Sequence, residues 1–160
     1  MIAQLDTKTV YTFMDSLISI KKYVKTAKNL GYQALGMMDI DNLYGAYHFM
    51  EIATEQGIQP LLGVEMTLEY VDVPLNLRFL ALDSQGYRNL MKLSTLKMIG
   101  KRKWEEFQHL LEGVAIIVPV FEGIEALDLG REFYIGVFPD TPKQVFHHTT
   151  CLLYTSLMAR

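Results

Sequence analysis

The chain has 160 residues, of which 50% are hydrophobic and 21% are charged, and its formal net charge is -3. This composition excludes an intrinsically disordered chain, and the small negative charge gives no overall attraction to nucleic acid. No apolar run reaches the roughly 18 residues that a membrane-spanning helix needs, and the N-terminus lacks the pattern of a secretory signal. The single cysteine, Cys151, fits a reducing cytoplasm, so we expect a cytoplasmic globular protein with no membrane partner.

Strands and helices are predicted to alternate in the first half of the chain, beginning with a strand that ends before Asp6. Ser19 is placed to cap a helix that stops at Gly31 and whose apolar face comprises Ile20, Tyr23, Val24 and Ala27. A strand over residues 34–38 follows. A second helix, over about 43–55, has Asn42 as its predicted N-cap and an apolar face of Ala46, Tyr47, Met50 and Ala53.

The second half continues this alternation. Strands are predicted over 61–71 and 75–82 with a turn at Val73–Pro74, then a helix over 86–98 whose apolar face comprises Tyr87, Leu90, Met91 and Ser94. A short helix over 103–111 and strands over 113–120 and 131–137 complete the pattern. Such alternation predicts one α/β domain built on a parallel sheet or barrel.

Acidic side chains occur where the predicted strands end. Asp6 and Lys8 follow the first strand, Asp39 and Asn42 follow the second, and Glu65 lies within the third. Carboxylates gathered at one edge of a sheet are able to bind Mg²⁺, Mn²⁺ or Zn²⁺ and activate water for phosphoester hydrolysis. The competing interpretation, which the spacing alone favours, is that these residues cap the helices that follow.

Three other groups of polar residues are candidate sites. A zinc site formed by His147, His148 and Cys151 is disfavoured against a solvated tail, and His48 is expected to be an exposed or capping residue. A basic patch beside Trp104 is able to meet a phosphate backbone, but a solvated helix surface is the favoured interpretation for its residues, Lys97, Lys101, Arg102 and Lys103.

The order of three motifs carries a family resemblance. Asp39–Gly45 (DIDNLYG), Gly57–Glu65 (GIQPLLGVE) and Gly86–Ser94 (GYRNLMKLS) resemble segments of the N-terminal PHP (polymerase and histidinol phosphatase) domain of bacterial DNA polymerase III alpha subunits. The resemblance covers roughly residues 1–138 and is strongest to the smaller, error-prone type of Gram-positive bacteria. It implies a distorted (β/α)7 barrel with parallel strands, incomplete in residues 1–148, and residues 149–160 are expected to be a non-native or disordered tail.

The resemblance also identifies degenerate metal-site positions. Where active members have a His-Leu-His-x-His run, Gln4, Asp6 and Lys8 replace the three histidines, and Ile40 replaces a histidine beside Asp39. Asp15, Asp39 and Glu65 match acidic positions of the family. Asp39 and Glu65 are weak candidates for metal ligands, but the cation of Lys8 opposes metal binding electrostatically. We therefore expect no metal, no cofactor and no catalytic residue in this fragment.

The resemblance implies a part in DNA replication. We expect a structural PHP-domain fragment of a DNA-directed DNA polymerase, a nucleotidyltransferase whose Mg²⁺ ions lie in a palm domain outside these residues. Its implied partners are the polymerase core of the same subunit, replisome components and primer–template DNA. The alternatives are an active metal-dependent phosphoesterase or 3′–5′ exonuclease of the PHP superfamily, and an independent binding module of the same fold.

Overall fold

The structure is a computed structural model that describes residues 3–121 and 124–137. The chain divides into two compact units, residues 1–115 and residues 116–160, which are considered separately. Within the described ranges, no helix has both the length and the apolar character to cross a membrane. The predicted tail, residues 149–160, and the histidines and cysteine near it lie outside the described residues.

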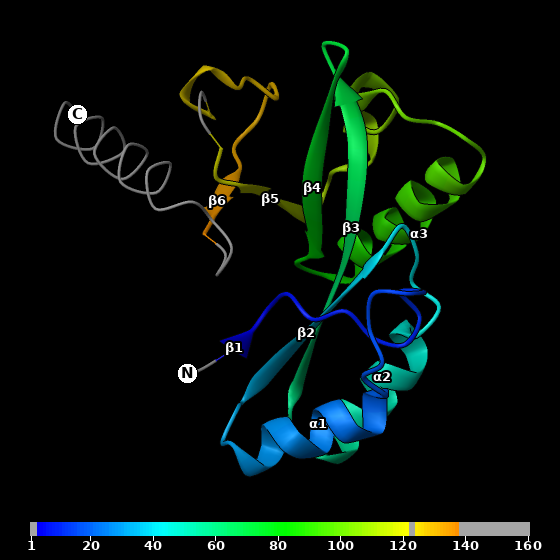
Figure 1. Cartoon of the computed structure of the whole chain (residues 1–160), viewed down its shortest axis with the longest axis vertical. Helices are drawn as coiled ribbons and strands as arrows, with labels where there is room; N and C mark the ends of the chain where they lie inside the picture. Colours follow the sequence, from blue (N-terminus) through cyan, green and yellow to red (C-terminus); the bar gives the residue numbers. More distant parts are fainter. Residues whose placement is uncertain (1–2, 122–123, 138–160) are drawn as a thin grey trace, which may run out of the picture. The chain divides into compact units, whose positions relative to one another are not determined.

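The first unit is built on four strands in the order β1-β2-β3-β4 (Figure 1). These are β1 (Ala3–Gln4), β2 (Ala34–Ile40), β3 (Gln59–Tyr70) and β4 (Val73–Ala81). The predicted parallel pairing holds for β1 with β2 and for β2 with β3. It is wrong for β3 and β4, which form an antiparallel hairpin because only two residues connect them. This register pairs Ile40 with Glu65 and Glu65 with Arg78.

The second unit contains most of β5 (Val114–Pro119), which begins at the end of the first unit, and β6 (Tyr134–Gly136). These two strands pair in parallel, with Ile117 opposite Tyr134. A 3₁₀ turn, η3 (Ile124–Ala126), lies between them in the sequence. The predicted strand over 113–120 is confirmed, and the last predicted strand is shortened to three residues.

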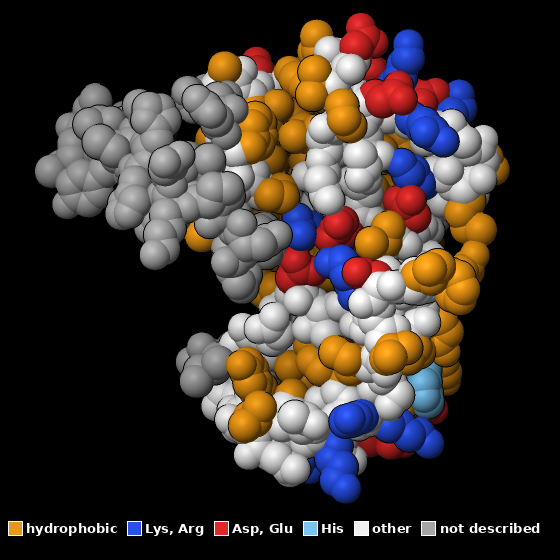
Figure 2. Space-filling model, viewed as in Figure 1, with side chains coloured by type: hydrophobic (Ala, Val, Ile, Leu, Met, Phe, Trp, Pro, Cys, Tyr) orange, Lys and Arg blue, Asp and Glu red, His pale blue; other side chains and the backbone are white. Residues whose placement is uncertain are grey.

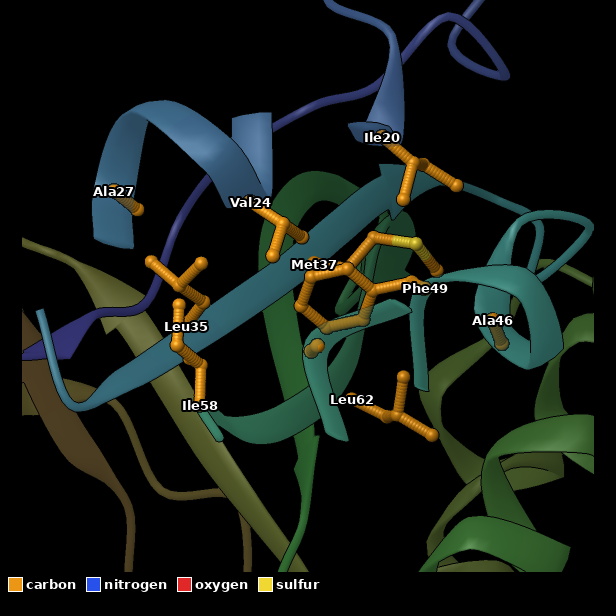
Figure 3. Packing of buried hydrophobic residues seen from close by; sticks show 10 residues of the cluster. Ile20, Val24, Ala27, Leu35, Met37, Ala46, Phe49, Ile58 and Leu62 are labelled. Carbon is orange, nitrogen blue, oxygen red and sulfur yellow. The ribbon is translucent and has the colours of Figure 1, made fainter. Parts of the chain in front are cut away.

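Helices α1 (Ile20–Asn29) and α2 (Ala46–Glu55) bury one face each in the core (Figure 3). The face predicted for α1 is confirmed, with Tyr23 half-buried at its margin. The face predicted for α2 is partly wrong, because Phe49 is fully buried and Tyr47 is exposed. The aromatic rings of Phe49 and Tyr23 stack with centroids 6.1 Å apart, which joins the two helices over β2.

The third helix, α3 (Ser84–Met98), is capped by Asp83, whose carboxylate accepts a hydrogen bond of 2.7 Å from the Gly86 amide. Leu90 and Ser94 are buried as predicted, whereas Met91 is exposed and Leu93 takes the core position. The short helix predicted over 103–111 forms two 3₁₀ turns instead, η1 (Trp104–Glu106) and η2 (Gln108–Leu110).

The predicted cap of the second helix is also displaced. Asn42 does not cap α2, whose N-cap is Gly45. Instead the Asn42 side chain closes the turn that precedes the helix, donating to the Ile40 carbonyl at 2.8 Å and accepting from the Tyr44 amide at 3.2 Å. Asn42 therefore shapes the end of β2 rather than the start of α2.

The β3–β4 hairpin turns at Val71 and Asp72, not at the predicted Val73–Pro74. Both residues have positive φ, 49° and 60°. A two-residue hairpin with left-handed backbone at both positions is the type I′ turn, which Asn-Gly suits best. A β-branched valine in this conformation is strained, by roughly 1–2 kcal/mol for a left-handed residue with a side chain.

We expect Val71→Asn combined with Asp72→Gly to raise the free energy of unfolding by about 1 kcal/mol, because both new residues tolerate the left-handed region. Urea unfolding followed by circular dichroism measures the change. Val73→Asn is the matched control, since the same side-chain change then falls on an exposed strand position with ordinary backbone. An unchanged or lowered stability of the double variant would contradict the assigned turn strain.

Candidate functional site

The chain after β1 runs close along β2 and delivers the polar residues of the candidate site. The Met38 amide donates to the Thr7 carbonyl at 2.9 Å, which extends the contact beyond the two paired residues of β1. Gly36 permits this approach, because a Cβ there would lie 2.1 Å from the Leu5 carbonyl oxygen. Asp6, Lys8 and Thr9 consequently lie beside the carboxyl-terminal half of β2.

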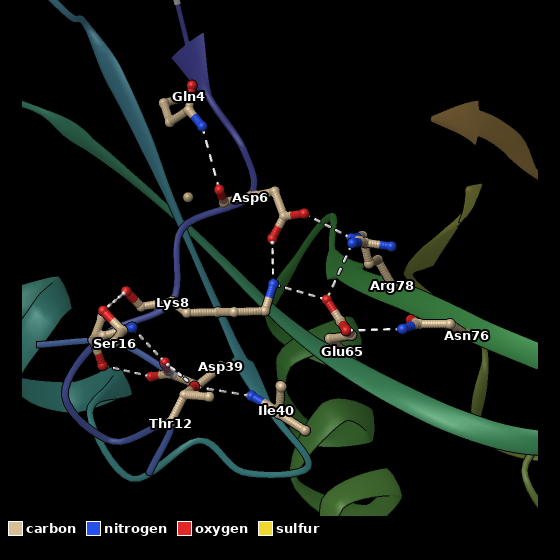
Figure 4. Close-up of polar contacts among 12 residues, drawn as sticks. Gln4, Asp6, Lys8, Thr12, Ser16, Asp39, Ile40, Glu65, Asn76 and Arg78 are labelled. Carbon is tan, nitrogen blue, oxygen red and sulfur yellow. Dashed lines mark hydrogen bonds and ion pairs between the residues drawn. The ribbon is translucent and has the colours of Figure 1, made fainter. Parts of the chain in front are cut away.

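Asp39, at the end of β2, is fully buried and hydrogen-bonded to the N-terminal loop (Figure 4). Its Oδ1 accepts from the Thr9 amide at 2.6 Å and from the Thr12 hydroxyl at 2.7 Å, and its Oδ2 accepts from the Thr9 hydroxyl at 2.7 Å. The Thr12 hydroxyl in turn accepts from the Ile40 amide at 3.2 Å. This carboxylate, a candidate ligand by sequence, holds the loop in place.

Asp6, Lys8, Glu65 and Arg78 form a closed network of ion pairs (Figure 4), which we call the ion-pair network. The ammonium of Lys8 lies 3.1 Å from Asp6 Oδ1 and 2.9 Å from Glu65 Oε2. The guanidinium of Arg78 contacts the same two carboxylates, at 2.8 Å from Asp6 Oδ2 and 3.2 Å from Glu65 Oε2. Asn76 completes the set by donating to Glu65 Oε1 at 2.9 Å.

The charges of the ion-pair network balance. Burial lowers the pKa of the Lys8 ammonium, but its hydrogen bond to Glu65 and the negative charge of Asp6 outweigh burial, and the net pKa is raised above the ordinary 10.5. Lys8 therefore stays protonated at neutral pH. Two cations face two carboxylates, and their side chains are only 9–21% exposed, so solvent screens them less than an ordinary surface pair. Figure 2 shows acidic and basic side chains gathered together in the middle of this face.

The remaining predicted site residues stand apart from this network. Gln4 is exposed, and its side-chain amide donates to the Asp6 carbonyl at 3.2 Å. Asp15 is exposed and takes part in none of the ion pairs of the described residues. Ile40 is partly exposed at the end of β2 and offers no donor atom. Of the seven positions, the structure brings together Asp6, Lys8 and Glu65, and it assigns Asp39 to a separate set of bonds.

Sequence reasoning missed Arg78, Thr9 and Thr12. Arg78 is a single cation in a mostly apolar strand, β4, which pairs with the strand that carries Glu65. Thr9 and Thr12 are spaced three residues apart in the loop after β1. Neither signal is specific without the register of β3 and β4.

The residues present do not fit a histidine-rich metal cluster. Within residues 3–121 and 124–137, no three side chains of His, Cys, Asp or Glu are grouped to hold a metal ion. Asp39 accepts three hydrogen bonds from threonine donors, and Asp6 and Glu65 are bound by two cations. A divalent ion at these carboxylates would have to displace Lys8 or lie beside its positive charge.

Two of the four cationic side chains of the basic patch, Lys97 and Lys101, are engaged within the protein. Lys101 pairs with Glu106 at 2.7 Å, Lys97 donates to the Thr67 carbonyl, and the Glu106 carboxylate also accepts from the amides of Arg102 and Lys103. Trp104 is buried, so its ring is not available for stacking on a nucleic-acid base. The arrangement favours a structural role over a phosphate-binding surface. His48 is half-buried and lies 3.8 Å from Glu51 on the same helix.

Comparison with known proteins agrees with the fold. Residues 4–135 match the PHP domain family. The chain belongs to the PHP domain family. It is 47% identical over 137 residues to a DNA polymerase III subunit alpha of Streptococcus pyogenes serotype M1, covering 86% of this chain and 13% of that protein. A DNA polymerase III subunit alpha of Rickettsia felis is 30% identical over 128 residues, covering 75% of this chain and 11% of that protein.

The chain thus spans about an eighth of the length of the curated relatives it matches. Among solved structures, an amidohydrolase from Chromobacterium violaceum aligns with a TM-score of 0.55 at 12% identity, covering 73% of this chain and 66% of that chain. At that identity the likeness concerns the α/β barrel-type fold alone.

Asp41 is an unusual residue beside this PHP-domain site. Its backbone is left-handed, with φ 58°, and is tied on both sides, by its amide to the Glu65 carbonyl and by its carbonyl to the Ser94 hydroxyl. Its Oδ1 is buried without a hydrogen-bond partner among the described residues. Burial raises the pKa of the Asp41 carboxyl above its ordinary 3.8, and the attraction of Lys97 offsets only part of that effect.

We expect Asp41→Asn to stabilise the protein at pH 7 by up to about 1 kcal/mol, a modest value because the side chain is only half-buried. Because the pKa is raised in the folded state, the carboxylate destabilises the fold above that pKa, and the effect vanishes below about pH 3.8, where both states are protonated. Thermal melting from pH 3 to pH 7 measures the gain. Asp15→Asn, on an exposed carboxylate, is the control, and a gain that does not shrink in acid would contradict the account.

Proposed function

We propose that this chain is a structural, non-catalytic PHP domain of a DNA polymerase III alpha subunit. The observation that carries the proposal is the Lys8 ammonium, which is ion-paired to both Asp6 and Glu65 where the family's active members place histidines and a metal cluster. In this chain, fixed side-chain cations supply the positive charge that a metal would otherwise bring to the strand ends.

Electrostatics supports the absence of a metal-dependent reaction. Two unit charges 4 Å apart interact by about 4 kcal/mol at an effective dielectric constant of 20, and a divalent ion doubles the repulsion from Lys8. The neutral nitrogen ligands that zinc prefers are missing, because Gln4 and Ile40 replace two of the family's histidines. Without a metal there is no activated water for phosphoester hydrolysis at this site.

The activity of the whole protein is part of the proposal. The relatives are named DNA polymerase III subunit alpha, which supports a parent that is a DNA-directed DNA polymerase acting in replication in the cytoplasm. Its nucleotidyl transfer would take place with Mg²⁺ in a palm domain outside these residues, on primer–template DNA and among replisome components. The polymerase core of the same subunit is the proposed partner of the PHP domain.

One observation favours the alternative of an active phosphoesterase or 3′–5′ exonuclease. Asp6 and Glu65 converge on a single atom, Lys8 Nζ, so two carboxylates lie close enough to share a cation. For catalysis, a divalent ion would have to replace that ammonium, and the two hypotheses are therefore separated by metal binding.

We expect the purified chain to bind neither zinc nor manganese stoichiometrically, because its carboxylates are already paired. Elemental analysis after dialysis against each metal measures binding, and single-stranded DNA labelled at its 5′ end reports 3′–5′ degradation. An active PHP phosphoesterase is the positive control. About one metal ion per chain together with metal-dependent degradation would establish the alternative, and primer extension by the chain alone would refute the assignment of polymerisation to another domain.

We expect Lys8→Met to lower the free energy of unfolding by about 2–3 kcal/mol, less than for a fully buried pair, because two carboxylates, Asp6 and Glu65, then share the single cation of Arg78 in the ion-pair network. The pKa of Lys8 is raised in the folded state, so its contribution is fully present below pH 10.5 and is lost as the pH rises through the folded value. The difference from the unsubstituted chain should therefore be constant from pH 7 to about pH 10 and shrink above it.

Urea unfolding of Lys8→Met, Glu65→Gln and the double variant measures this contribution and its coupling to Glu65. Lys21→Met, on the exposed face of α1, is the matched control and should change stability by less than about 0.5 kcal/mol. Equal effects at positions 8 and 21, or strictly additive effects at positions 8 and 65, would show that the ion-pair network does not stabilise the fold.

A further inference from the structure

The loop over residues 9–18 presents three large apolar side chains to solvent. Phe13, Met14 and Leu17 are 88%, 92% and 97% exposed. Isolated apolar residues are common on protein surfaces, but three nearly fully exposed ones within five positions form a patch that normally marks a contact site.

This loop is fixed by its own hydrogen bonds. The Val10 amide donates to the Ile18 carbonyl at 3.1 Å and closes the loop, and the Ser16 hydroxyl donates to the Lys8 carbonyl at 2.7 Å. Thr9 and Thr12 anchor its first half to the buried carboxylate of Asp39. The apolar side chains are thus displayed on a held scaffold.

Met14 adds backbone strain to this display. Its φ of 65° is in the left-handed region, which is unfavourable for a residue with a long side chain. A strained residue persists where the surrounding bonds determine its conformation, and such residues concentrate at binding sites. The Met14 side chain points into solvent despite this strained backbone. No contact among the described residues accounts for the conformation.

Exposed apolar side chains also lie on the elements next to this loop. The Asn42 side chain donates to the Tyr11 carbonyl at 3.2 Å, which holds the loop against the turn before α2. The exposed Tyr44 in that turn contacts Met98 Sδ through its hydroxyl at 3.6 Å, and Ile99 follows at the end of α3. Figure 2 shows hydrophobic side chains along this edge of the first unit, between α3 and α2. We call this surface the apolar rim; its residues are Phe13, Met14, Leu17, Tyr44, Met98 and Ile99.

We propose that the apolar rim is the surface on which the remainder of the alpha-subunit polypeptide docks. The inference rests on the proposed function, in which the PHP domain is one part of a long chain, and it assigns the contact to the loop over 9–18 and its neighbours. The relatives supply the candidate occupant, because this chain matches only 13% of the length of the Streptococcus pyogenes subunit.

The size of the rim favours an occupant in the same polypeptide over a second copy of this chain. A stable interface between separate proteins involves about 20–30 residues on each side, more than the six that make up the rim. A covalently linked partner is held at a high effective concentration and forms a stable contact through a smaller area. An intrachain contact also explains a loop that is held in its docking conformation by Asp39.

The test places this chain in a full-length subunit. The matching segment of the Streptococcus pyogenes serotype M1 subunit is replaced by residues 1–137, and the chimera is compared with its Phe13→Ser, Met14→Ser, Leu17→Ser triple variant. We expect the triple variant to be cleaved by protease between the PHP domain and the rest at least about tenfold faster, because the docked state is opened. The matched control carries Leu30→Ser, Val73→Ser and Leu82→Ser, three exposed apolar positions outside the rim, and should stay within about twofold of the chimera.

The same three serine substitutions are also made in the 160-residue chain alone, where thermal melting shows whether they affect folding. The triple variant should melt within about 2 °C of the unsubstituted chain, since the removed side chains are exposed. Equal cleavage of all chimeras, or failure of the unsubstituted chimera to assemble, would overturn the proposal. A dimer of the 160-residue chain that the triple variant dissolves would overturn it too, by identifying a second copy as the occupant. Metal and nuclease assays test the proposed function separately, because the rim contains no residue of the ion-pair network.

Discussion

The ion-pair network, in which Lys8 and Arg78 each contact the carboxylates of Asp6 and Glu65, joins three separate segments of this protein. Asp6 and Lys8 come from the chain that follows β1, Glu65 comes from β3, and Arg78 comes from β4. None of these charges would be tolerated in a half-buried position without its partners, because the desolvation of an isolated charge is costly. The register of the β3–β4 hairpin, which sets Glu65 opposite Arg78, is therefore coupled electrostatically to the path of the N-terminal segment.

Asp39, a metal-ligand candidate by the family resemblance, has a structural role in this protein. The carboxylate lies at the end of β2, and its oxygens accept three hydrogen bonds from Thr9 and Thr12. Its work is to fix a loop, and that loop carries the apolar side chains of the rim. The buried Asp39 side chain therefore links the end of β2 to the loop that carries the proposed docking surface.

Backbone strain in the described residues is concentrated at such places. The four non-glycine residues with positive φ are Met14, Asp41, Val71 and Asp72. Met14 lies in the loop held by Asp39, Asp41 lies beside Asp39 itself, and the other two form the hairpin turn that sets the Glu65–Arg78 register. Each position is over-determined by hydrogen bonds or by chain connection, which is the condition under which strained conformations persist.

Residue patterns along the chain were sufficient to predict most of the local elements and the family. Periodicity identified the buried face of α1 and the positions of the main strands, and the motifs at Asp39–Gly45, Gly57–Glu65 and Gly86–Ser94 identified a PHP domain. The replacement of ligand histidines by Lys8 and Ile40 stays a prediction from the family resemblance. Local pattern was less decisive where adjacent residues are both apolar, as on α2, where Phe49 rather than Tyr47 is buried.

Only the tertiary structure decided which charges meet. Arg78 and Asp6 are 72 positions apart, and their contact depends on the antiparallel register of β3 and β4, which a two-residue turn at Val71–Asp72 sets. The threonine bonds to Asp39 likewise depend on the close approach of the N-terminal segment that Gly36 permits. Pairing across a sheet is fixed by register and by backbone separation, and neither quantity is encoded in the spacing of residues along one strand.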